Sequence, residues 1–308
     1  MPELSRVAII GTGTMGPGMG AVLERAGIKT TLYDVASEAL ERARSGAEMA
    51  RGVLERLEVP ETPGGKLSFE SDLASALDGA EMVIEAVPEK LELKQQVFAE
   101  FEQHTDPSTI LASNTSGIPI TKIAAGLEHP ERVIGMHWSN PPHLIPMIEV
   151  IPGERTSDAV LEATNAVVER TGYYPVVIRK EVPGFVENRI LYAIMRECLA
   201  LVDEGVIDAE GVDLNVKWGI GYKLAVIPPM ALLDMAGLDI YESVAGYLNQ
   251  DLSTEAGVSE TITKLTNEGK LGIKTGGGMY EYDEEKLKTL PAQRAGQLIA
   301  VRKALSGD

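Results

Sequence analysis

The sequence predicts an α/β fold, in which a doubly wound parallel sheet is followed by a smaller all-helical domain. Up to Ile178, short apolar runs rich in β-branched residues alternate with segments of helical composition. This is the pattern of parallel strands joined by crossover helices. Pro183 and Gly184 then break the chain, and the segments beyond them are helical. We therefore expect an N-terminal domain at residues 1–183 and a C-terminal domain at residues 184–308.

The expected strands are short buried runs that end in turn-forming or helical residues. In chain order they are Val7–Ile10, Thr30–Tyr33, Met82–Ala86, Ile110–Ser113, Val133–Met136, Met147–Ile151 and Tyr174–Ile178. Helices are expected at Gly16–Ala26 and after Ser37, and two prolines with two adjacent glycines predict a loop at residues 59–65. The C-terminal helices are expected at Asn188–Glu204, Val212–Trp218, Met230–Leu248, Glu260–Asn267 and Glu284–Leu305.

The chain is strongly acidic and carries one cysteine. Its 28 Lys and Arg residues against 46 Asp and Glu residues give a net charge of −18, which argues against nucleic acid and anionic membrane surfaces as partners. No apolar run approaches the ~20 residues of a membrane span, and Met1–Arg6 lacks the features of a signal peptide. Because Cys198 is the only cysteine, no internal disulfide can form. We expect a cytoplasmic protein.

A glycine motif joins the first strand to the first helix. Its spacing is G-x-G-x-x-G, and an aspartate follows the second strand. Glycines at these places allow the tight turn, the approach of a pyrophosphate to the helix N-terminus and close helix–strand packing, while the aspartate would bind ribose hydroxyls and repel a 2′-phosphate. These features predict a Rossmann domain that binds NAD rather than NADP. The predicted cofactor-binding residues here are Gly11, Gly13, Thr14, Met15, Gly16 and Asp34.

A histidine and a glutamate stand in two apolar strands. His137 follows Val133–Met136 at the carboxyl end of its strand, and Glu149 lies within Met147–Ile151. A carboxylate inside a buried strand needs a partner, and a glutamate paired with a histidine would fix its tautomer and make it a better base. A satisfied core histidine and an edge-strand glutamate explain these two residues equally well.

Motifs spread over the whole chain resemble, in the same order, those of the 3-hydroxyacyl-CoA dehydrogenase family. They are Gly11–Gly16, Val87–Glu89 with Lys94, Ser113–Ser116, Gly135–His137, Asn140–Pro141, Glu149–Ile151, Val182–Arg189 and Lys270–Tyr280. The resemblance implies a Rossmann domain, a helical dimerisation domain that makes a homodimer, and NAD as the cofactor. It also implies hydride transfer between NAD and a small-molecule substrate, with no metal ion.

The resemblance also implies roles for individual residues. By position, His137 would be the general base and Glu149 its orienting partner. Ser116 and Asn188 would hold the substrate oxygen near the histidine, and Asn140 would shape the site beside the nicotinamide. The remaining residues that it places in the cofactor site are Glu89, Lys94 and Asn114.

Two departures from the CoA-dependent members of the family point to a smaller substrate. Trp138 and Ser139 follow His137 where those members usually carry two phenylalanines, so Trp138, Ser139, Asn140 and Ser116 are expected to contact the substrate. Residues 57–66 hold one lysine where those members are lysine-rich. A third feature, Asn140–Pro142 with Ile145–Glu149, resembles members that act on free small acids. The segments Gly135–His143, Trp218–Lys223 and Leu233–Tyr241 resemble a member that oxidises a pyridine aldehyde acid. The expected substrate is therefore a small carboxylated alcohol or a hydrated aldehyde.

Aldehyde oxidation would need no thiol in such a site. Cys198 lies mid-helix and is expected to be structural, and a hydrated aldehyde is formally an alcohol, so the His–Glu pair could deprotonate it directly.

Two other functions stay open at this point. One is a short-chain 3-hydroxyacyl-CoA dehydrogenase, and the other is a non-catalytic, crystallin-like protein that binds NAD.

Overall fold

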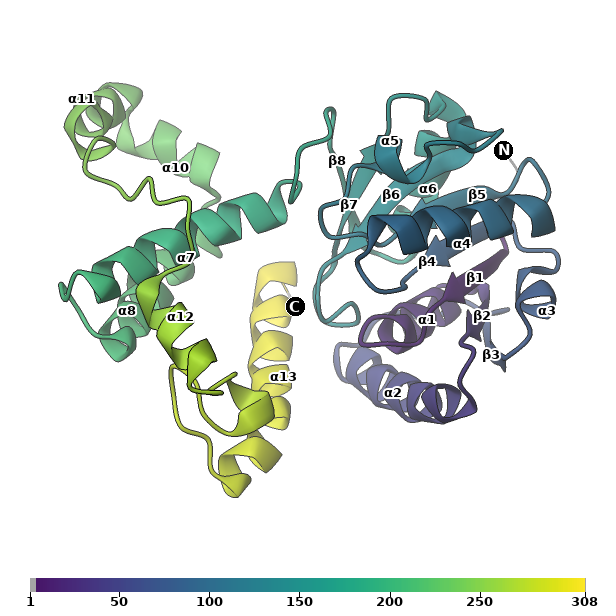
Figure 1. Ribbon diagram of the computed structural model, residues 1–308, viewed down its shortest axis with the longest axis horizontal. Coiled ribbons are helices and arrows are strands. Elements are labelled where there is room, and N and C mark those ends of the chain that lie inside the picture. Colours follow the sequence, from purple (N-terminus) through teal and green to yellow (C-terminus); the bar gives the residue numbers. More distant parts are fainter. Residues whose placement is uncertain (1–3, 308) are drawn as a thin grey trace. The chain divides into compact units, whose positions relative to one another are not determined.

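The computed structural model describes residues 4–307, and the chain divides into two compact units at residues 1–188 and 189–308. The first unit is an eight-stranded sheet with helices on both faces (Figure 1). Across the sheet the strands follow the order β3-β2-β1-β4-β5-β6-β7-β8. Their bounds are β1 Arg6–Ile10, β2 Lys29–Tyr33, β3 Lys66–Glu70, β4 Met82–Glu85, β5 Ile110–Ser113, β6 Val133–Trp138, β7 Met147–Pro152 and β8 Tyr174–Val177.

The strand order is that of a doubly wound sheet, as the sequence predicts. β1 pairs in parallel with β2 on one side and with β4 on the other, so the chain changes its direction of travel across the sheet at this strand. A crevice that binds ligands lies beyond the carboxyl ends of the strands at such a switch point. The glycine motif begins at Gly11, directly after β1.

The two faces of the sheet carry separate apolar cores. Because neighbouring strand residues point to opposite faces, Ile9 packs in one core and Ile10 in the other. The helices that cover the first core are α1 Gly16–Arg25, α2 Ser37–Arg56 and α6 Asp158–Arg170. Those that cover the second core are α3 Leu73–Leu77, α4 Leu91–His104 and α5 Ile120–Ile123. The strands are thus buried on both sides, which explains their continuous apolar runs.

β7 runs antiparallel to β6, whereas the alternation of strands and helices predicts a parallel sheet. The reason is the connection. Residues 139–146 contain no helix, and a parallel crossover needs a dozen or more residues, usually with a helix among them. The antiparallel register makes His137 and Glu149 direct partners across the two strands.

β3 at Lys66–Glu70 is a strand that the sequence analysis did not predict, although its residues alternate between polar and apolar as in a half-buried strand. It is held at the edge of the sheet by Glu24 of α1. The carboxylate of Glu24 accepts a hydrogen bond from the backbone N–H of Leu67 at 3.0 Å and forms an ion pair with Arg51 of α2 at 2.7 Å. Gly65 permits the close approach of the chain to α1 that this anchoring needs.

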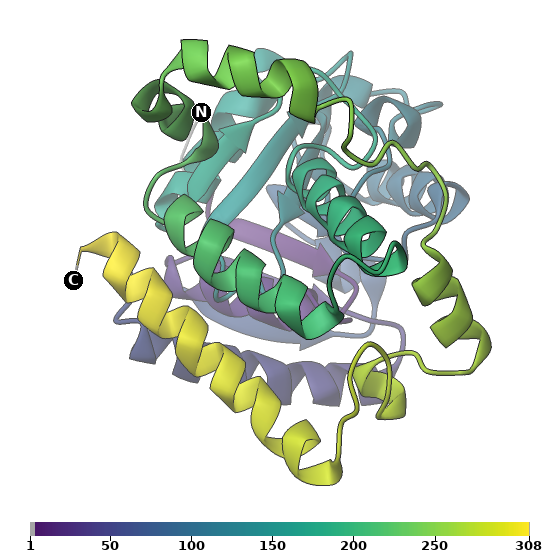
Figure 2. The same cartoon turned by 90° about the vertical axis from the view of Figure 1, so that its left-hand side faces the viewer.

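The second unit is built of helices (Figure 2). They are α7 Glu187–Asp203, which begins in the first unit, α8 Ala209–Asn215, a π-helix at Val216–Gly221, α9 Tyr222–Leu224, α10 Pro229–Ala236, α11 Leu238–Leu248, α12 Glu260–Asn267 and α13 Glu284–Ser306. The single helix expected at Met230–Leu248 is two helices, because Gly237 has a φ of 97° and ends α10. Within the part of the chain that the structure describes, no helix is long and apolar enough to cross a membrane.

The contact between Gly65 and α1 predicts the effect of a small substitution. A Cβ at Gly65 would lie 1.8 Å from the backbone oxygen of Glu24, whereas one at Gly52 in α2 would meet nothing within 4 Å. Gly65→Ala should lower the free energy of unfolding in urea by about 1–3 kcal/mol. The matched Gly52→Ala should raise it by about 0.5–1 kcal/mol, because alanine favours a helix interior. Equal effects of the two variants would contradict the described packing of β3 on α1.

Candidate active site

The glycine turn after β1 is formed by close backbone approach. Gly11 has a φ of 110°, and a Cβ there would lie 2.6 Å from the carbonyl oxygen of Ala86. A Cβ at Gly16 would lie 2.5 Å from the carbonyl oxygen of Gly11, but one at Gly13 would meet nothing within 4 Å. The turn therefore packs tightly against strand and helix and leaves Gly13 facing open space.

The open side of this turn fits a dinucleotide phosphate. Met15 occupies the N-cap of α1 without a side-chain hydrogen bond, and the first turn of α1 contains no acidic residue. Helix N-termini of this kind bind anions through their unpaired N–H groups and the helix dipole. Gly13 and Thr14 are exposed beside it, so backbone and solvent-facing side chains are available to the ligand.

The carboxylate of Asp34 is fixed by the glycine turn itself. Its Oδ2 accepts hydrogen bonds from the backbone N–H of Thr12 at 3.1 Å and from the Thr12 hydroxyl at 2.7 Å. Its Oδ1 accepts one from the N–H of Ala36 at 3.1 Å. Partial burial opposes ionisation, but these hydrogen bonds outweigh it and hold the pKa of Asp34 below its ordinary value. The negative charge that disfavours a 2′-phosphate is therefore present at neutral pH.

His137 and Glu149 form a buried pair across β6 and β7. Nδ1 of His137 lies 2.8 Å from Oε2 of Glu149. His137 is 6% exposed and Glu149 is 1% exposed. Because the carboxylate engages Nδ1, Nε2 is the ring nitrogen left to exchange a proton with a substrate.

The start of α7 holds the second oxygen of Glu149. Its Oε1 accepts hydrogen bonds from the backbone N–H groups of Val186 at 3.0 Å and Glu187 at 2.9 Å. Phe185, fully buried, places its ring 5.8 Å from the His137 ring between centroids. Burial acts to raise the pKa of Glu149, but the hydrogen bonds from His137 and the two N–H groups keep it below its ordinary value. The ionised carboxylate can thus stabilise an imidazolium at His137.

Lys94 lies in a buried ion-pair network rather than in solvent. Its Nζ lies 2.7 and 2.8 Å from the two carboxylate oxygens of Glu85 and 3.2 Å from Oε2 of Glu89. Glu85 is fully buried and also accepts a hydrogen bond from the Ser113 hydroxyl at 2.6 Å. Burial raises the pKa of Glu85 above its ordinary value, and Lys94 and Ser113 oppose that rise.

Glu89 connects this network to the two residues expected to hold the substrate oxygen. Its Oε1 accepts hydrogen bonds from the Thr115 hydroxyl at 2.5 Å and from the backbone N–H of Ser116 at 3.0 Å. The carbonyl oxygen of Ser116 accepts a hydrogen bond from Nδ2 of Asn188 at 3.0 Å. The structure therefore brings Glu89, Ser116 and Asn188 together. Asn188 directly follows Glu187, whose backbone N–H binds Glu149.

The side chain of Trp138 lies in the core. It is 1% exposed and packs 5.9 Å from the ring of Tyr173 between centroids. Neighbouring residues of β6 face opposite sides of the sheet, so this side chain points away from His137. Only the backbone N–H of Trp138 serves the site, donating to Oδ1 of Asn114 at 2.9 Å. The structure does not bring Trp138 to the substrate wall, whereas Asn140 is exposed just after β6.

Three polar residues of the site were not predicted from the sequence. Thr12 fixes Asp34, Glu85 fixes Lys94, and Glu187 accepts a hydrogen bond from the buried Ser139 hydroxyl. A signal existed for Glu85, since it is a lone carboxylate in an apolar strand, as Glu149 is. Glu187 lies within the motif Val182–Arg189, but it stands where a connecting segment enters a helix and no apolar run around it marks its carboxylate as buried.

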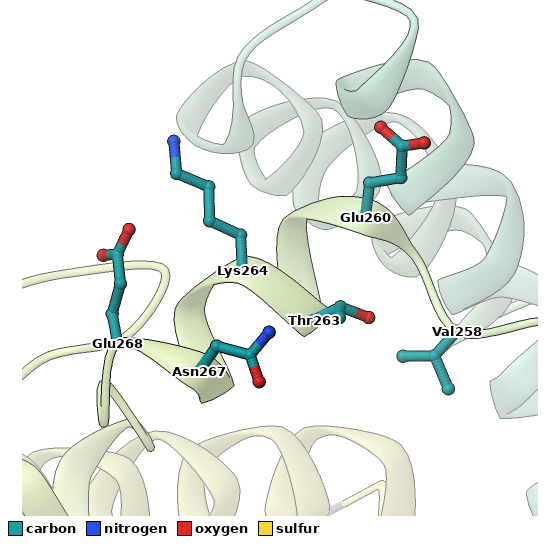
Figure 3. Close-up of a pocket in the computed structure, with 6 residues that line it drawn as sticks. All are labelled: Val258, Glu260, Thr263, Lys264, Asn267 and Glu268. Carbon is teal, nitrogen blue, oxygen red and sulfur yellow. The ribbon is translucent and has the colours of Figure 1, made fainter.

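The second unit carries a hollow of its own. It is formed along α12 and its preceding turn (Figure 3), and the side chains that line it are Val258, Glu260, Thr263, Lys264, Asn267 and Glu268. These side chains come from α12 and the residues that flank it, and they point in different directions without converging on a point. We assign it no chemistry.

A doubly wound sheet with this glycine turn, an ionised aspartate after β2 and a buried His–Glu pair defines a dinucleotide-dependent dehydrogenase. The model of the 3-hydroxyacyl-CoA dehydrogenase NAD-binding domain matches residues 6–182, and that of the C-terminal domain matches residues 184–282. The chain belongs to the 3-hydroxyacyl-CoA dehydrogenase family and is an NAD-dependent oxidoreductase.

Similar proteins span nearly the whole chain. A 5-formyl-3-hydroxy-2-methylpyridine 4-carboxylate 5-dehydrogenase from Mesorhizobium japonicum is 51% identical over 306 residues, which is 99% of each chain. A crystal structure of a dehydrogenase for this aldehyde, described as an NAD+-dependent dismutase, matches with a TM-score of 0.96, 51% identity and 99% coverage of each chain. A probable 3-hydroxybutyryl-CoA dehydrogenase from Bacillus subtilis is 35% identical over 92% of this chain and 99% of that protein.

The fixed carboxylate of Asp34 predicts cofactor choice. In Asp34→Ser, a charged hydrogen-bond acceptor for the ribose is lost together with the repulsion of a 2′-phosphate. The ratio of kcat/KM for NAD to that for NADP should fall about 10- to 100-fold. Asp72→Asn is the control, because Asp72 caps α3 by accepting a hydrogen bond from Ser75 and should leave this ratio unchanged. An unaltered preference in Asp34→Ser would contradict the assignment.

The burial of Lys94 predicts a loss of stability. Lys94→Met leaves the buried Glu85 carboxylate without its cation, which should lower the free energy of unfolding by about 3–5 kcal/mol. Adding Glu85→Gln to that variant should recover part of the loss, since no buried charge then remains at residue 85. Urea unfolding of both variants measures this, with Lys66→Met as an exposed-lysine control. A loss no larger than that of the control would show that the ion pair does not stabilise the fold.

Proposed function

We propose that the protein oxidises a small carboxylated aldehyde in its hydrated form, with NAD as the hydride acceptor. The type of substrate is 5-formyl-3-hydroxy-2-methylpyridine 4-carboxylate, the compound for which the relative at 51% identity is named. We also propose that the same site, with the NADH so formed as hydride donor, reduces a second aldehyde molecule to its alcohol. The observation that carries the proposal is the buried His137–Glu149 pair, because it supplies a base without a thiol nucleophile.

The residues of the pair have distinct roles in this proposal. Nε2 of His137 takes the proton from one hydroxyl of the hydrated aldehyde, while NAD+ accepts the hydride from the same carbon. Glu149 holds Nδ1, which fixes the tautomer and stabilises the imidazolium that forms. In the reductive direction the imidazolium returns its proton to the carbonyl oxygen of the aldehyde.

The surroundings of the pair support a small, polar substrate over a CoA thioester. Ser139, next to the strand that carries His137, is buried and bound to Glu187, so this side of the pair is polar rather than apolar. The net charge of −18 and the single lysine in residues 57–66 give the phosphates of CoA little to bind.

The remaining residues complete the proposal. Ser116 and Asn188 position the reacting oxygen, and Ser139 and Asn140 contact the substrate. The proposed contacts with NAD are made by Gly11, Gly13, Thr14, Met15, Gly16, Asp34, Glu89 and Asn114. Lys94, which was expected among them, is buried on Glu85 and instead holds Glu89 in place. Trp138 is left out of the substrate contacts, because its side chain lies in the core.

We also propose that the NAD-binding domain comprises residues 1–183 and the second domain residues 184–308. We propose that two copies of the chain form a homodimer through their second domains. Support for the boundary comes from the two family models, which match residues 6–182 and 184–282. Support for the dimer comes from the large apolar side chains that α10 and α11 expose, since a surface of this kind marks an interface. They are Met230, Met235, Leu238, Ile240, Tyr241, Tyr247 and Leu248.

We propose a cytoplasmic location. The single cysteine agrees with a reducing compartment such as the cytoplasm.

Turnover of a substrate panel tests the proposed function. With NAD+ the wild type should convert the pyridine aldehyde acid to the corresponding acid, and it should form NADH more slowly or not at all with 3-hydroxybutyryl-CoA and free 3-hydroxybutyrate. His137→Ala should lower kcat by about 10²–10⁴-fold, because it removes the general base, while the Kd for NAD stays unchanged. Glu149→Gln should lower kcat in the same direction. A preference for the CoA thioester, or near-normal turnover by His137→Ala, would contradict the proposal.

A further inference from the structure

Glu187 places a second carboxylate beside the His137–Glu149 pair. A ring nitrogen of His137, a carboxylate oxygen of Glu149 and one of Glu187 all lie within 4.8 Å of one another. The backbone N–H of Glu187 binds Glu149 at 2.9 Å, so the start of α7 fixes both carboxylates relative to each other. Proton transfer to His137 needs one carboxylate, which Glu149 provides. The second carboxylate has no role in that step.

The two oxygens of Glu187 differ in their contacts. Oε1 accepts a hydrogen bond from the Ser139 hydroxyl. Oε2 is buried and has no hydrogen-bond partner among the described residues. A buried oxygen without a partner is costly and needs an explanation. Glu187 as a whole is half-buried and its carboxylate lies within the cluster with His137 and Glu149.

A hydrogen-bond donor is the partner that suits this oxygen, since a carboxylate oxygen accepts hydrogen bonds. A hydrated aldehyde carries two hydroxyls on the reacting carbon. One of them must donate to His137 in order to lose its proton. The other has no acceptor within the His137–Glu149 pair, since Glu149 is already bound by His137, Val186 and Glu187.

We propose that Oε2 of Glu187 accepts a hydrogen bond from the second hydroxyl of the hydrated aldehyde, and that Glu187 thereby selects the hydrated form for oxidation. This inference rests on the proposed function. In the step, the C–H bond breaks and its electron pair leaves as hydride to NAD+, while the proton of the first hydroxyl passes to His137. The carbon is oxidised, a C=O bond forms, and the second hydroxyl stays on the carbon as part of the carboxylic acid. In this step Ser139 acts through Glu187, because its hydroxyl holds Oε1.

The inference predicts that the two directions of turnover respond differently to one variant. Glu187→Gln keeps the size of the side chain and removes its charge. Oxidation of the aldehyde to the acid with NAD+ should fall about 10- to 100-fold in kcat/KM, the cost of a charged hydrogen bond. In the reduction of the same aldehyde to the alcohol with NADH, the reacting carbon carries a single oxygen, so the hydrogen bond to Glu187 is not made. The kcat/KM of this reduction should therefore change less than about threefold.

The experiment measures acid and alcohol separately by chromatography, each direction at its own optimum pH. Ser139→Ala should shift the ratio of the two products in the same direction as Glu187→Gln, by a smaller factor. The matched control is Glu181→Gln, since Glu181 binds the backbone N–H of Thr121 at 3.0 Å and is not part of the cluster. That control should leave the product ratio unchanged.

Three other outcomes would overturn the inference. Equal losses in both directions would overturn the inference, because Glu187 would then only support the His137–Glu149 pair. No loss in either direction would overturn it as well. Loss of wild-type activity with EDTA and its return with Zn2+ alone would instead assign the cluster to a metal and also overturn it. Absence of wild-type turnover of the aldehyde in either direction would be a failure of the proposed function, which is distinguishable from all of these.

Discussion

The antiparallel pairing of β7 with β6 is the constraint on which the active site depends. It makes His137 and Glu149 direct partners across the two strands, and both side chains then emerge on the same face of the sheet. A shift of the register by one residue would send one of them to the opposite face. The hydrogen bond of 2.8 Å between them is thus a consequence of strand register, set by residues 139–146 that turn the chain back.

Two strands of this sheet carry a buried carboxylate, and each carboxylate is stabilised by different partners. Glu149 is bound by an imidazole and by two N–H groups at the start of α7, which suits a group that must stabilise a proton on its neighbour. Glu85 is bound by an ammonium and a hydroxyl, which suits a group that holds a loop in place. A buried glutamate therefore serves the proton transfer in β7 and the stability of the fold in β4, and its hydrogen-bond partners decide which role it has.

The start of α7 links these parts of the site. Within residues 185–188, Phe185 packs on the imidazole, two N–H groups bind Glu149, the Glu187 carboxylate meets Ser139, and Asn188 binds the backbone of Ser116. Phe185 adopts a φ of 48°, an uncommon conformation for a residue with a side chain. This bend directs four successive residues at one site, so a short segment sets both the base and the polar surface that faces a substrate.

The sequence by itself determined the α/β class, the glycine turn with Asp34, and the pairing of His137 with Glu149 as a hypothesis. These features are encoded locally, in strand length, in glycine spacing and in a carboxylate within an apolar run. Only the tertiary structure decided that β7 is antiparallel, that β3 forms an edge strand, that Lys94 is buried on Glu85, that Trp138 faces the core and that Glu187 stands beside His137. Each of these depends on which distant segments meet and on which face a side chain emerges, and no pattern within a few residues specifies that.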